Sequence, residues 1–265
     1  MASFDVRRQR GFTTIALIAF VALYAPLVTL VAYSFNAGAT LGVWEGFSWR
    51  WYQAAWQNER VQDATLRSLI VAVFAAAFAT LIAVMAALGT TRTGPYRGRT
   101  AVYALINQPL MVPEIVTGTA LLIAFAGVKQ ATGYQGLGYL IAAHTAFCIP
   151  FAYLPIRARL EGLDATLETA AADLYAPPWA AFRRVTLPLM APGILAGAML
   201  AFVISLDDVV ITELVKTAGQ DTLPTYMLGQ LRRQITPEIN AISTVLLGVS
   251  ALIVTLFFVL TRKRA

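Results

Sequence analysis

The residues that could carry chemistry in this sequence are acids within long apolar stretches. Glu114 lies in one such stretch, and Asp207 and Asp208 lie near the end of another. An ionisable side chain inside a membrane span is costly and by default indicates function. Carboxylates suit a cationic solute, because ion pairing is strong where the dielectric constant is low. The candidate residues of a solute path are therefore Glu114, Asp207, Asp208, Ser205 and Thr117.

Structural roles for the same residues stay open. Asp207 and Asp208 lie close enough to the end of their stretch for exposure at the membrane surface to explain them. Glu114 could instead pair with a side chain of another subunit. The hydroxyls of Ser205 and Thr117 could bond back to their own helix. With a rise of about 1.5 Å per residue, Glu114 and Asp207 both fall in the outer half of a bilayer, where they could line one cavity.

Clusters typical of catalysis or metal binding are missing from the sequence. It has one histidine, His144, and one cysteine, Cys148, and we interpret His144 as a core residue rather than a proton relay. We expect no catalytic residues, no metal site and no intramembrane enzyme. A phosphate-binding P-loop needs Gly-Lys-Ser/Thr, and none of the three lysines follows a glycine. The chain itself therefore carries no ATP site, and energy from ATP must come through another subunit.

The elements that position these residues are transmembrane helices. Hydrophobic residues make up 58% of the 265 residues and charged residues 13%, whereas a soluble domain carries about 25% charged residues. The apolar stretches are long enough to cross a bilayer, which takes about 20 residues per helix. We predict an all-α membrane protein with a single transmembrane domain over residues 1–265. Its six spans are expected at residues 12–35, 66–89, 100–126, 136–156, 189–212 and 240–261.

Basic residues indicate the orientation of the chain. With both termini inside, the inner segments hold 13 Lys and Arg residues and the outer segments 7. The positive-inside rule therefore places both termini in the cytoplasm of a multi-pass inner-membrane protein. The terminal basic residues in this count are Arg7, Arg8, Arg10, Arg262, Lys263 and Arg264. This topology accounts for the net charge of +6, so we expect no binding to nucleic acid.

Aromatic residues gather in the outer segment 36–65, which includes Trp44, Trp49, Trp51 and Trp56. Tryptophan favours the membrane–water interface, because its ring is apolar while its N–H seeks a partner. An interfacial helix explains this composition, and a docking surface for an external partner protein is compatible with it.

The inner segment 161–188 is long for a connection, and such loops usually carry function. Residues 164–174 are rich in Ala and Leu and include Asp164, Glu168 and Asp173, and the pair Pro177-Pro178 cannot continue their helix. Small side chains let the surface of a partner approach closely. An amphipathic helix on the membrane surface is the alternative.

The same segment resembles the EAA loop of ABC-importer permeases, which reads Glu-Ala-Ala, three residues, Gly, and then about nine residues to a terminal Leu-Pro. Ala170 and Ala171 match the two alanines, and Leu187-Pro188 matches the end. The resemblance implies that 161–188 is a coupling loop whose helix rests in a groove of an ATPase. The coupling residues that it implies are Asp164, Glu168, Thr169, Ala170, Ala171, Asp173, Tyr175, Leu187 and Pro188.

Two positions depart from the EAA pattern. Thr169 takes the place of the usual Glu, with Glu168 one position earlier, and Tyr175 takes the place of the usual Gly. Glycine frees the backbone for a turn, so we expect Tyr175 to turn the chain in another way.

Over almost its whole length the chain resembles the polyamine (spermidine/putrescine) importer permeases of the PotC type. The supporting stretches are 113–116, 205–210, 223–224 and 236–241. The resemblance implies the type I ABC importer permease fold with a cytoplasmic coupling helix. It also implies a permease subunit that forms half of the translocation pathway for a small cationic solute such as putrescine or spermidine. The expected partners are a second homologous permease, two cytoplasmic ABC ATPase subunits that bind ATP and Mg²⁺, a periplasmic solute-binding protein and membrane lipid.

Two alternative functions stay open from the sequence. A permease of the same importer class could carry another small nitrogenous solute, such as an amino-acid-like, opine or betaine-like compound. An ion-driven secondary transporter would need a proton relay within the membrane, for which Glu114 and His144 are the candidates. That second alternative leaves the long inner loop 161–188 without a role.

Overall fold

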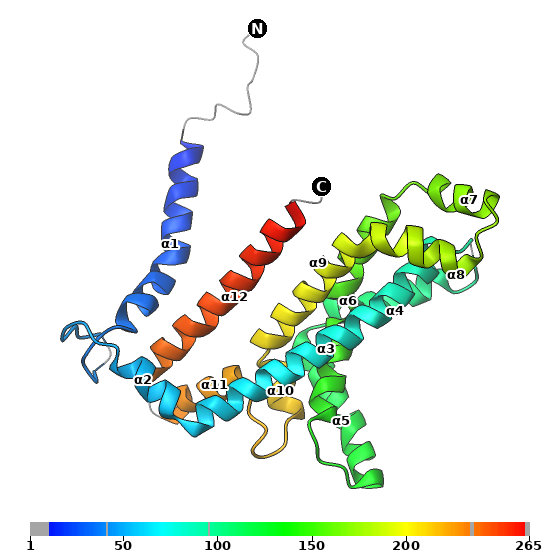
Figure 1. Ribbon diagram of the computed structural model, residues 1–265. Helices are drawn as coiled ribbons and strands as arrows, with labels where there is room; N and C mark the ends of the chain where they lie inside the picture. Colours follow the sequence, from blue (N-terminus) through cyan, green and yellow to red (C-terminus); the bar gives the residue numbers. More distant parts are fainter. Residues whose placement is uncertain (1–10, 41, 95, 234–235, 263–265) are drawn as a thin grey trace. The chain divides into compact units, whose positions relative to one another are not determined.

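The structure is a computed structural model that describes residues 11–40, 42–94, 96–233 and 236–262. The described residues are α-helical (Figure 1), apart from turns, loops and one isolated β-bridge between Asn36 and Phe47. The helices are α1 (Phe12–Tyr33), α2 (Arg50–Gln57), α3 (Glu59–Thr91), α4 (Arg99–Met111), α5 (Glu114–Thr132), α6 (Gly138–Glu161), α7 (Thr166–Asp173), α8 (Pro178–Ala181), the π-helix η2 (Phe182–Thr186), α9 (Leu187–Asp207), α10 (Val210–Val215), α11 (Leu223–Arg233) and α12 (Glu238–Arg262).

Six helical segments in the described part of the chain are long and apolar enough to cross a membrane, which confirms the predicted number. They are Phe12–Tyr33, Glu59–Thr91, Glu114–Thr132, Gly138–Glu161, Pro178–Asp207 and Glu238–Leu256. Of the terminal basic residues used for the orientation, Arg7, Arg8, Arg10, Lys263 and Arg264 lie outside the described residues.

The chain forms two compact units. The first consists of Met1–Glu59 and Gly229–Val249, and the second of Arg60–Leu228 and Ser250–Ala265. In the first unit, α1 is apolar along its length and contains no buried residue. An apolar helix with its whole surface exposed needs lipid or another protein around it.

The aromatic segment after α1 folds around Asn36. The side-chain oxygen of Asn36 accepts the backbone N–H of Glu45 (2.8 Å), and its backbone carbonyl accepts the indole N–H of Trp51 (2.9 Å). The rings of Phe35 and Phe47 stack, with centroids 5.4 Å apart. The segment is therefore closed by its own polar and aromatic contacts, and its helical part is the two-turn helix α2.

Close contact between α6 and α9 forms the centre of the second unit. A Cβ added at Gly197 would lie 2.5 Å from the carbonyl oxygen of Ala152, and one added at Gly193 would lie 2.6 Å from the Cβ of Arg159. Glycine at these positions lets the two helix backbones approach, as is typical of membrane helix pairs. Helix α3 adds a row of fully buried alanines to the same core: Ala79, Ala83 and Ala87.

The expected span 100–126 is not one helix. It breaks into α4 and α5 at Val112 and Pro113, where the backbone is extended (ψ 138° and 135°). Pro113 has no N–H to donate and disfavours helical geometry in the residue before it. The break places Glu114 at the first residue of α5 instead of midway along a helix, and it can be followed between α4 and α5 in Figure 1.

The expected span 189–212 breaks in the same way. Helix α9 ends at Asp207, Asp208 is extended (ψ 134°), and the short helix α10 begins at Val210. The Asp208 carboxylate accepts the backbone N–H groups of Ile211 and Thr212, which have no partner at a helix start. A capping side chain in the middle of an apolar stretch therefore starts a new helix.

Candidate solute path and coupling loop

The two helix breaks lie against each other, because α5 packs on α10. Gly118 of α5 touches Leu214 of α10 so closely that an added Cβ would lie 2.6 Å from its Cδ1 atom. Glu114 is the first residue of α5, and Asp208 lies in the link just before α10. The structure thus places two of the acids that the sequence singled out at the starts of two helices that pack together.

Asp207 and Asp208 are neighbours in the chain but have different surroundings. The Asp207 side chain is exposed, whereas Asp208 retains only 6% of its accessible surface. An extended residue directs successive side chains to opposite sides of the backbone. The break therefore turns one carboxylate inward and the other outward.

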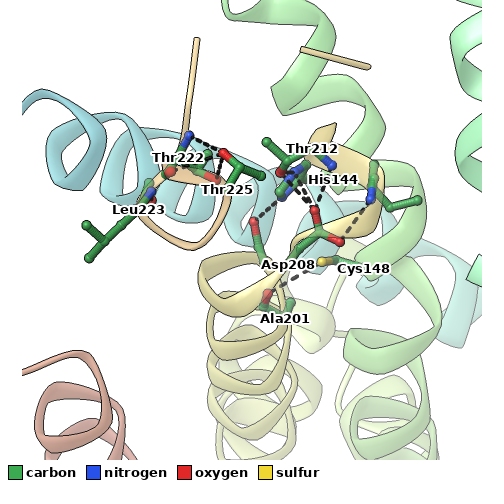
Figure 2. A network of polar contacts seen from close by, with 11 residues as sticks. His144, Cys148, Ala201, Asp208, Thr212, Thr222, Leu223 and Thr225 are labelled. Carbon is green, nitrogen blue, oxygen red and sulfur yellow. Dashed lines mark hydrogen bonds and ion pairs between the residues drawn. The ribbon is translucent and has the colours of Figure 1, made fainter. Parts of the chain in front are cut away.

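Asp208 is held on several sides by its own chain (Figure 2). Its Oδ1 accepts the N–H of Ile211 (3.2 Å), and its Oδ2 accepts both the N–H and the hydroxyl of Thr212 (2.8 Å each). The same Oδ2 lies 3.3 Å from Nε2 of His144. A carboxylate with this many donors is stabilised inside the protein without a bound cation.

His144 completes the network from α6. Its Nδ1 lies 2.8 Å from the Ser205 hydroxyl and its Nε2 lies 2.9 Å from the Thr212 hydroxyl. The side chains of His144 and Asp208 are each only 1% exposed. His144 is therefore a core histidine with both ring nitrogens partnered, in agreement with its interpretation from the sequence.

The five candidates for the solute path fall into three groups. Ser205 and Asp208 belong to the buried network, while Glu114 and Asp207 are more accessible. The hydroxyl of Thr117, one turn beyond Glu114, is buried and has no hydrogen-bond partner among the described residues. Thr117 and Glu114 share one face of α5, because residues three apart on a helix are neighbours.

Sequence reasoning missed that Thr212 connects His144 to Asp208. A usable signal was present, because an aspartate directly before an apolar run is typical of a helix N-cap. Among the described residues, no group of three or more His, Cys, Asp and Glu side chains could hold a metal ion.

The segment 161–188 forms α7, α8 and η2 and leads directly into α9. The helix expected at 164–174 is confirmed as α7. The carboxylate of Asp164 accepts the backbone N–H of Thr166 (2.9 Å) just before this helix, and the hydrogen bonds from Thr166 hold the pKa of Asp164 below its usual range. This bond begins the helix at a defined residue.

Glu168 faces its own chain rather than the surroundings. Its Oε2 lies 3.1 Å from Nε of Arg92, directly after α3, and its Oε1 accepts the hydroxyl of Thr186 (3.0 Å), just before α9. Arg92 also donates to the carbonyl of Leu163 (3.4 Å). Glu168 therefore connects α7 to two of the membrane-spanning segments.

Tyr175 takes the left-handed backbone conformation that glycine usually occupies, so the expectation that it turns the chain in another way is wrong. Its φ of 59° is the one positive value at a non-glycine residue in the described ranges. The N–H of Tyr175 bonds to the carbonyl of Ala172 (2.9 Å), and that of Ala176 to the carbonyl of Ala171 (3.0 Å). This pair of bonds is the Schellman motif, which needs a left-handed residue at this position.

The other implied coupling residues lie mostly on the surface. Thr169, Ala170, Asp173 and Pro188 are exposed, and Ala171 and Leu187 are half-buried. Apolar side chains are also displayed here: Leu174, Tyr175 and Trp179 expose 82%, 95% and 68% of their surface. The loop thus carries a strongly exposed apolar patch, which is typical of a contact surface for another protein.

Comparisons with known proteins agree with this geometry. The chain is 38% identical over 251 residues to the putrescine transport system permease protein PotI of Escherichia coli K12, covering 94% of this chain and 89% of PotI. It is 35% identical over 246 residues to the spermidine/putrescine transport system permease protein PotC of Haemophilus influenzae, covering 93% and 94% of the two chains. In fold it is similar to a chain of the crystal structure of a bacterial ABC transporter involved in the import of the acidic polysaccharide alginate (TM-score 0.73, 19% identity, 96% of each chain).

Six apolar helices, two helix breaks beside acidic residues and an exposed loop define a multi-pass membrane permease. The sequence profile of the binding-protein-dependent transport system inner membrane component family matches residues 79–263, and the chain belongs to this family. It is a permease subunit of an ABC importer, as the resemblance implied, and it lies in the inner membrane. ABC importer permeases are not enzymes and work with separate ATPase subunits and a periplasmic binding protein.

Proposed function

We propose that this permease carries a polyamine such as putrescine or spermidine and forms one half of the pathway. The observation that carries the proposal is that Glu114, Asp207 and Asp208 stand at two helix breaks, and that the helices α5 and α10 beside these breaks pack on each other. Carboxylates that lie near one another repel each other, and a cation between them relieves this repulsion. An ammonium group supplies the charge and the donors that such a pair lacks.

Glu114 and Asp207 are the acids that contact the solute. Asp208 is occupied by Ile211, Thr212 and His144, so its carboxylate contributes charge rather than a free binding surface. Transporter binding sites commonly lie at interrupted helices, where backbone groups near the break can also reach the solute. The hydroxyl of Thr117, which has no hydrogen-bond partner in the described part of the chain, provides one further polar group on this side of α5.

The remaining half of the pathway comes from a second homologous permease. Two cytoplasmic ATPases bind ATP and Mg²⁺, whereas this chain carries no cofactor, and a periplasmic binding protein delivers the solute. Both termini lie in the cytoplasm, which puts α7 on the side of the ATPases. The family name, which refers to a binding-protein-dependent transport system, supports the role of the binding protein, and the distribution of basic residues supports the orientation.

Motion of the ATPases reaches the membrane through the coupling loop. The patch of Leu174, Tyr175 and Trp179 contacts the ATPase, while Glu168 faces inward to Arg92 and Thr186. Displacing α7 therefore pulls on α3 and α9 together. Since α9 ends at Asp207, this movement reaches the helix break that holds the solute-contacting acids.

Uptake by the whole transporter in proteoliposomes tests the solute. Labelled putrescine and spermidine should accumulate only when ATP, the ATPase subunits and the binding protein are all present. A panel of unlabelled diamines should compete, while zwitterionic amino acids, opines and betaines should not. Competition by a zwitterion together with none by either polyamine would replace the polyamine with another nitrogenous solute.

A further inference from the structure

The buried network around His144 joins three helices at the break that displays Asp207. Ser205 lies on α9, His144 lies on α6, and Thr212 lies on α10. Asp208 stands in the link between α9 and α10 (Figure 2). Each of these four side chains is buried, with exposed fractions of 4%, 1%, 0% and 6%. The network therefore fixes the link from inside the protein.

The direction of the hydrogen bonds follows from what each group can donate. The Thr212 hydroxyl donates to the Asp208 carboxylate, which has no proton to give when ionised. The oxygen of Thr212 is then free to accept the N–H at Nε2 of His144. A neutral imidazole protonated at Nε2 accepts at Nδ1, so the Ser205 hydroxyl donates there.

The hydrogen bonds therefore run in one direction, from Ser205 to His144, from His144 to Thr212, and from Thr212 to Asp208. Each polar group in this series has a partner, and the imidazole of His144 needs no positive charge to make its two hydrogen bonds. A fully satisfied buried network holds its members in one geometry, because any rearrangement leaves a polar group unpaired.

We infer that His144 is a positioning residue for solute binding. It does not touch the solute, but through Thr212 it fixes the orientation of Asp208 and hence of the extended link. Asp207 is the last residue of α9, directly before Asp208, and it is exposed whereas Asp208 is buried, so fixing the link at Asp208 also fixes where the Asp207 carboxylate lies. This inference rests on the proposed role of Asp207 in contacting the solute.

Chemical labelling tests the inference without any solute. The chain has one cysteine, so Cys148→Ala gives a background in which Asp207→Cys is the single thiol of this subunit, and the label is read on this subunit alone. We expect His144→Leu to change the rate at which a maleimide labels this thiol in the assembled complex by about threefold or more. Tyr153→Phe is the matched control, because it removes another buried hydrogen bond of α6, to Thr90 (2.8 Å). Equal labelling rates with His144 and with Leu at this position would overturn the inference.

Transport kinetics provide the second readout, using whichever amine the wild-type complex takes up. His144→Leu should raise KM several-fold, because the Thr212 hydroxyl that holds Asp208 loses its buried partner, with kcat less affected. His144→Gln, which keeps one N–H donor, should recover most of this loss. A fall in kcat at unchanged KM would assign His144 a structural role only.

Thr212 allows the same test if His144→Leu fails to assemble. Thr212→Val keeps the shape of the side chain and removes the hydroxyl that joins His144 to Asp208, whereas Thr212→Ser keeps the hydroxyl. We expect the valine variant to reproduce the altered labelling and the serine variant to match the wild type. Wild-type labelling in both variants would contradict the inference. Failure of wild-type polyamine uptake would refute the proposed solute but leave the labelling result valid.

Discussion

Arg92, the residue directly after α3, and Glu168 in α7 form an ion pair, with Nε and Oε2 3.1 Å apart. Both side chains are largely shielded, at 21% and 29% exposure. Glu168 stands one position before the place where the EAA pattern has its glutamate, and its partners are in its own chain. Glu168 therefore connects α7 to the membrane-spanning helices through its own chain.

This ion pair gives a first prediction. Arg92→Glu and Glu168→Arg should each lower ATP-dependent uptake several-fold while the ATPases still copurify, because the docking surface is unchanged. The net stability lost should be about 1 kcal/mol or less, as for other partly exposed pairs. The double exchange, which restores opposite charges, should recover uptake. Loss of copurification in the single variants would instead place Glu168 in the ATPase interface.

A second prediction concerns the strained backbone at Tyr175. The left-handed conformation costs a non-glycine residue about 1–2 kcal/mol, and glycine pays no such penalty. Tyr175→Gly should therefore stabilise the end of α7 and slow hydrogen exchange of the Ala176 amide about fivefold or more. Tyr175→Ala is the control, because it removes the ring but keeps the strain. Equal exchange rates in the glycine and alanine variants would show that the strain has no such effect.

A third prediction concerns the contact between α6 and α9. Gly197→Ala would place a Cβ 2.5 Å from the carbonyl oxygen of Ala152, so the helices must separate. We expect a loss of about 1–3 kcal/mol of stability, as for other overpacked cores, and a lower melting temperature in detergent. Gly127→Ala in α5 is the control, since a Cβ there meets no atom within 4 Å. An unchanged melting temperature for Gly197→Ala would contradict this packing.

A fourth prediction follows from the cluster of Lys216, Glu213 and Asp221 after α10. Partial burial by itself lowers the pKa of Lys216, but hydrogen bonds from its ammonium to Asp221 and Glu213 outweigh this and raise the pKa above the usual 10.5. A raised pKa means that the cluster stabilises the fold below pH 10.5 and that this contribution is lost as the pH rises through the higher, folded-state value. Melting temperatures of the wild type and Lys216→Met should therefore differ at pH 8 and converge at strongly alkaline pH. A difference that persists there would exclude the ammonium as its source.

The number of membrane spans could be predicted from the sequence, because an apolar stretch of about 20 residues is typical of a transmembrane helix. The helix α7 could also be predicted, because a run of helix-forming residues ends before Pro177. Hydrophobicity did not reveal the breaks at Pro113 and Asp208, because both lie in stretches that remain apolar on either side. Such breaks depend on single residues, a missing N–H in one case and a capping carboxylate in the other.

The details of the site depended on contacts between distant segments. Asp207 and Asp208 are equivalent by composition, and only the fold shows that one faces the protein interior and the other does not. Glu168 likewise reads as a surface acid in an exposed helix, while its partners Arg92 and Thr186 lie 76 and 18 residues away in the chain. No local pattern connects side chains at such separations.

The most direct test of the proposed function is the kinetics of putrescine uptake by complexes that carry Glu114→Gln or Asp207→Asn. Each change removes one negative charge and keeps the size of the side chain. If both acids contact the cationic solute, KM should rise about tenfold or more for each variant, while basal ATPase activity and subunit assembly stay at the wild-type level. Wild-type KM values for putrescine in both variants would show that the solute does not pass these carboxylates, and would contradict the proposed solute path.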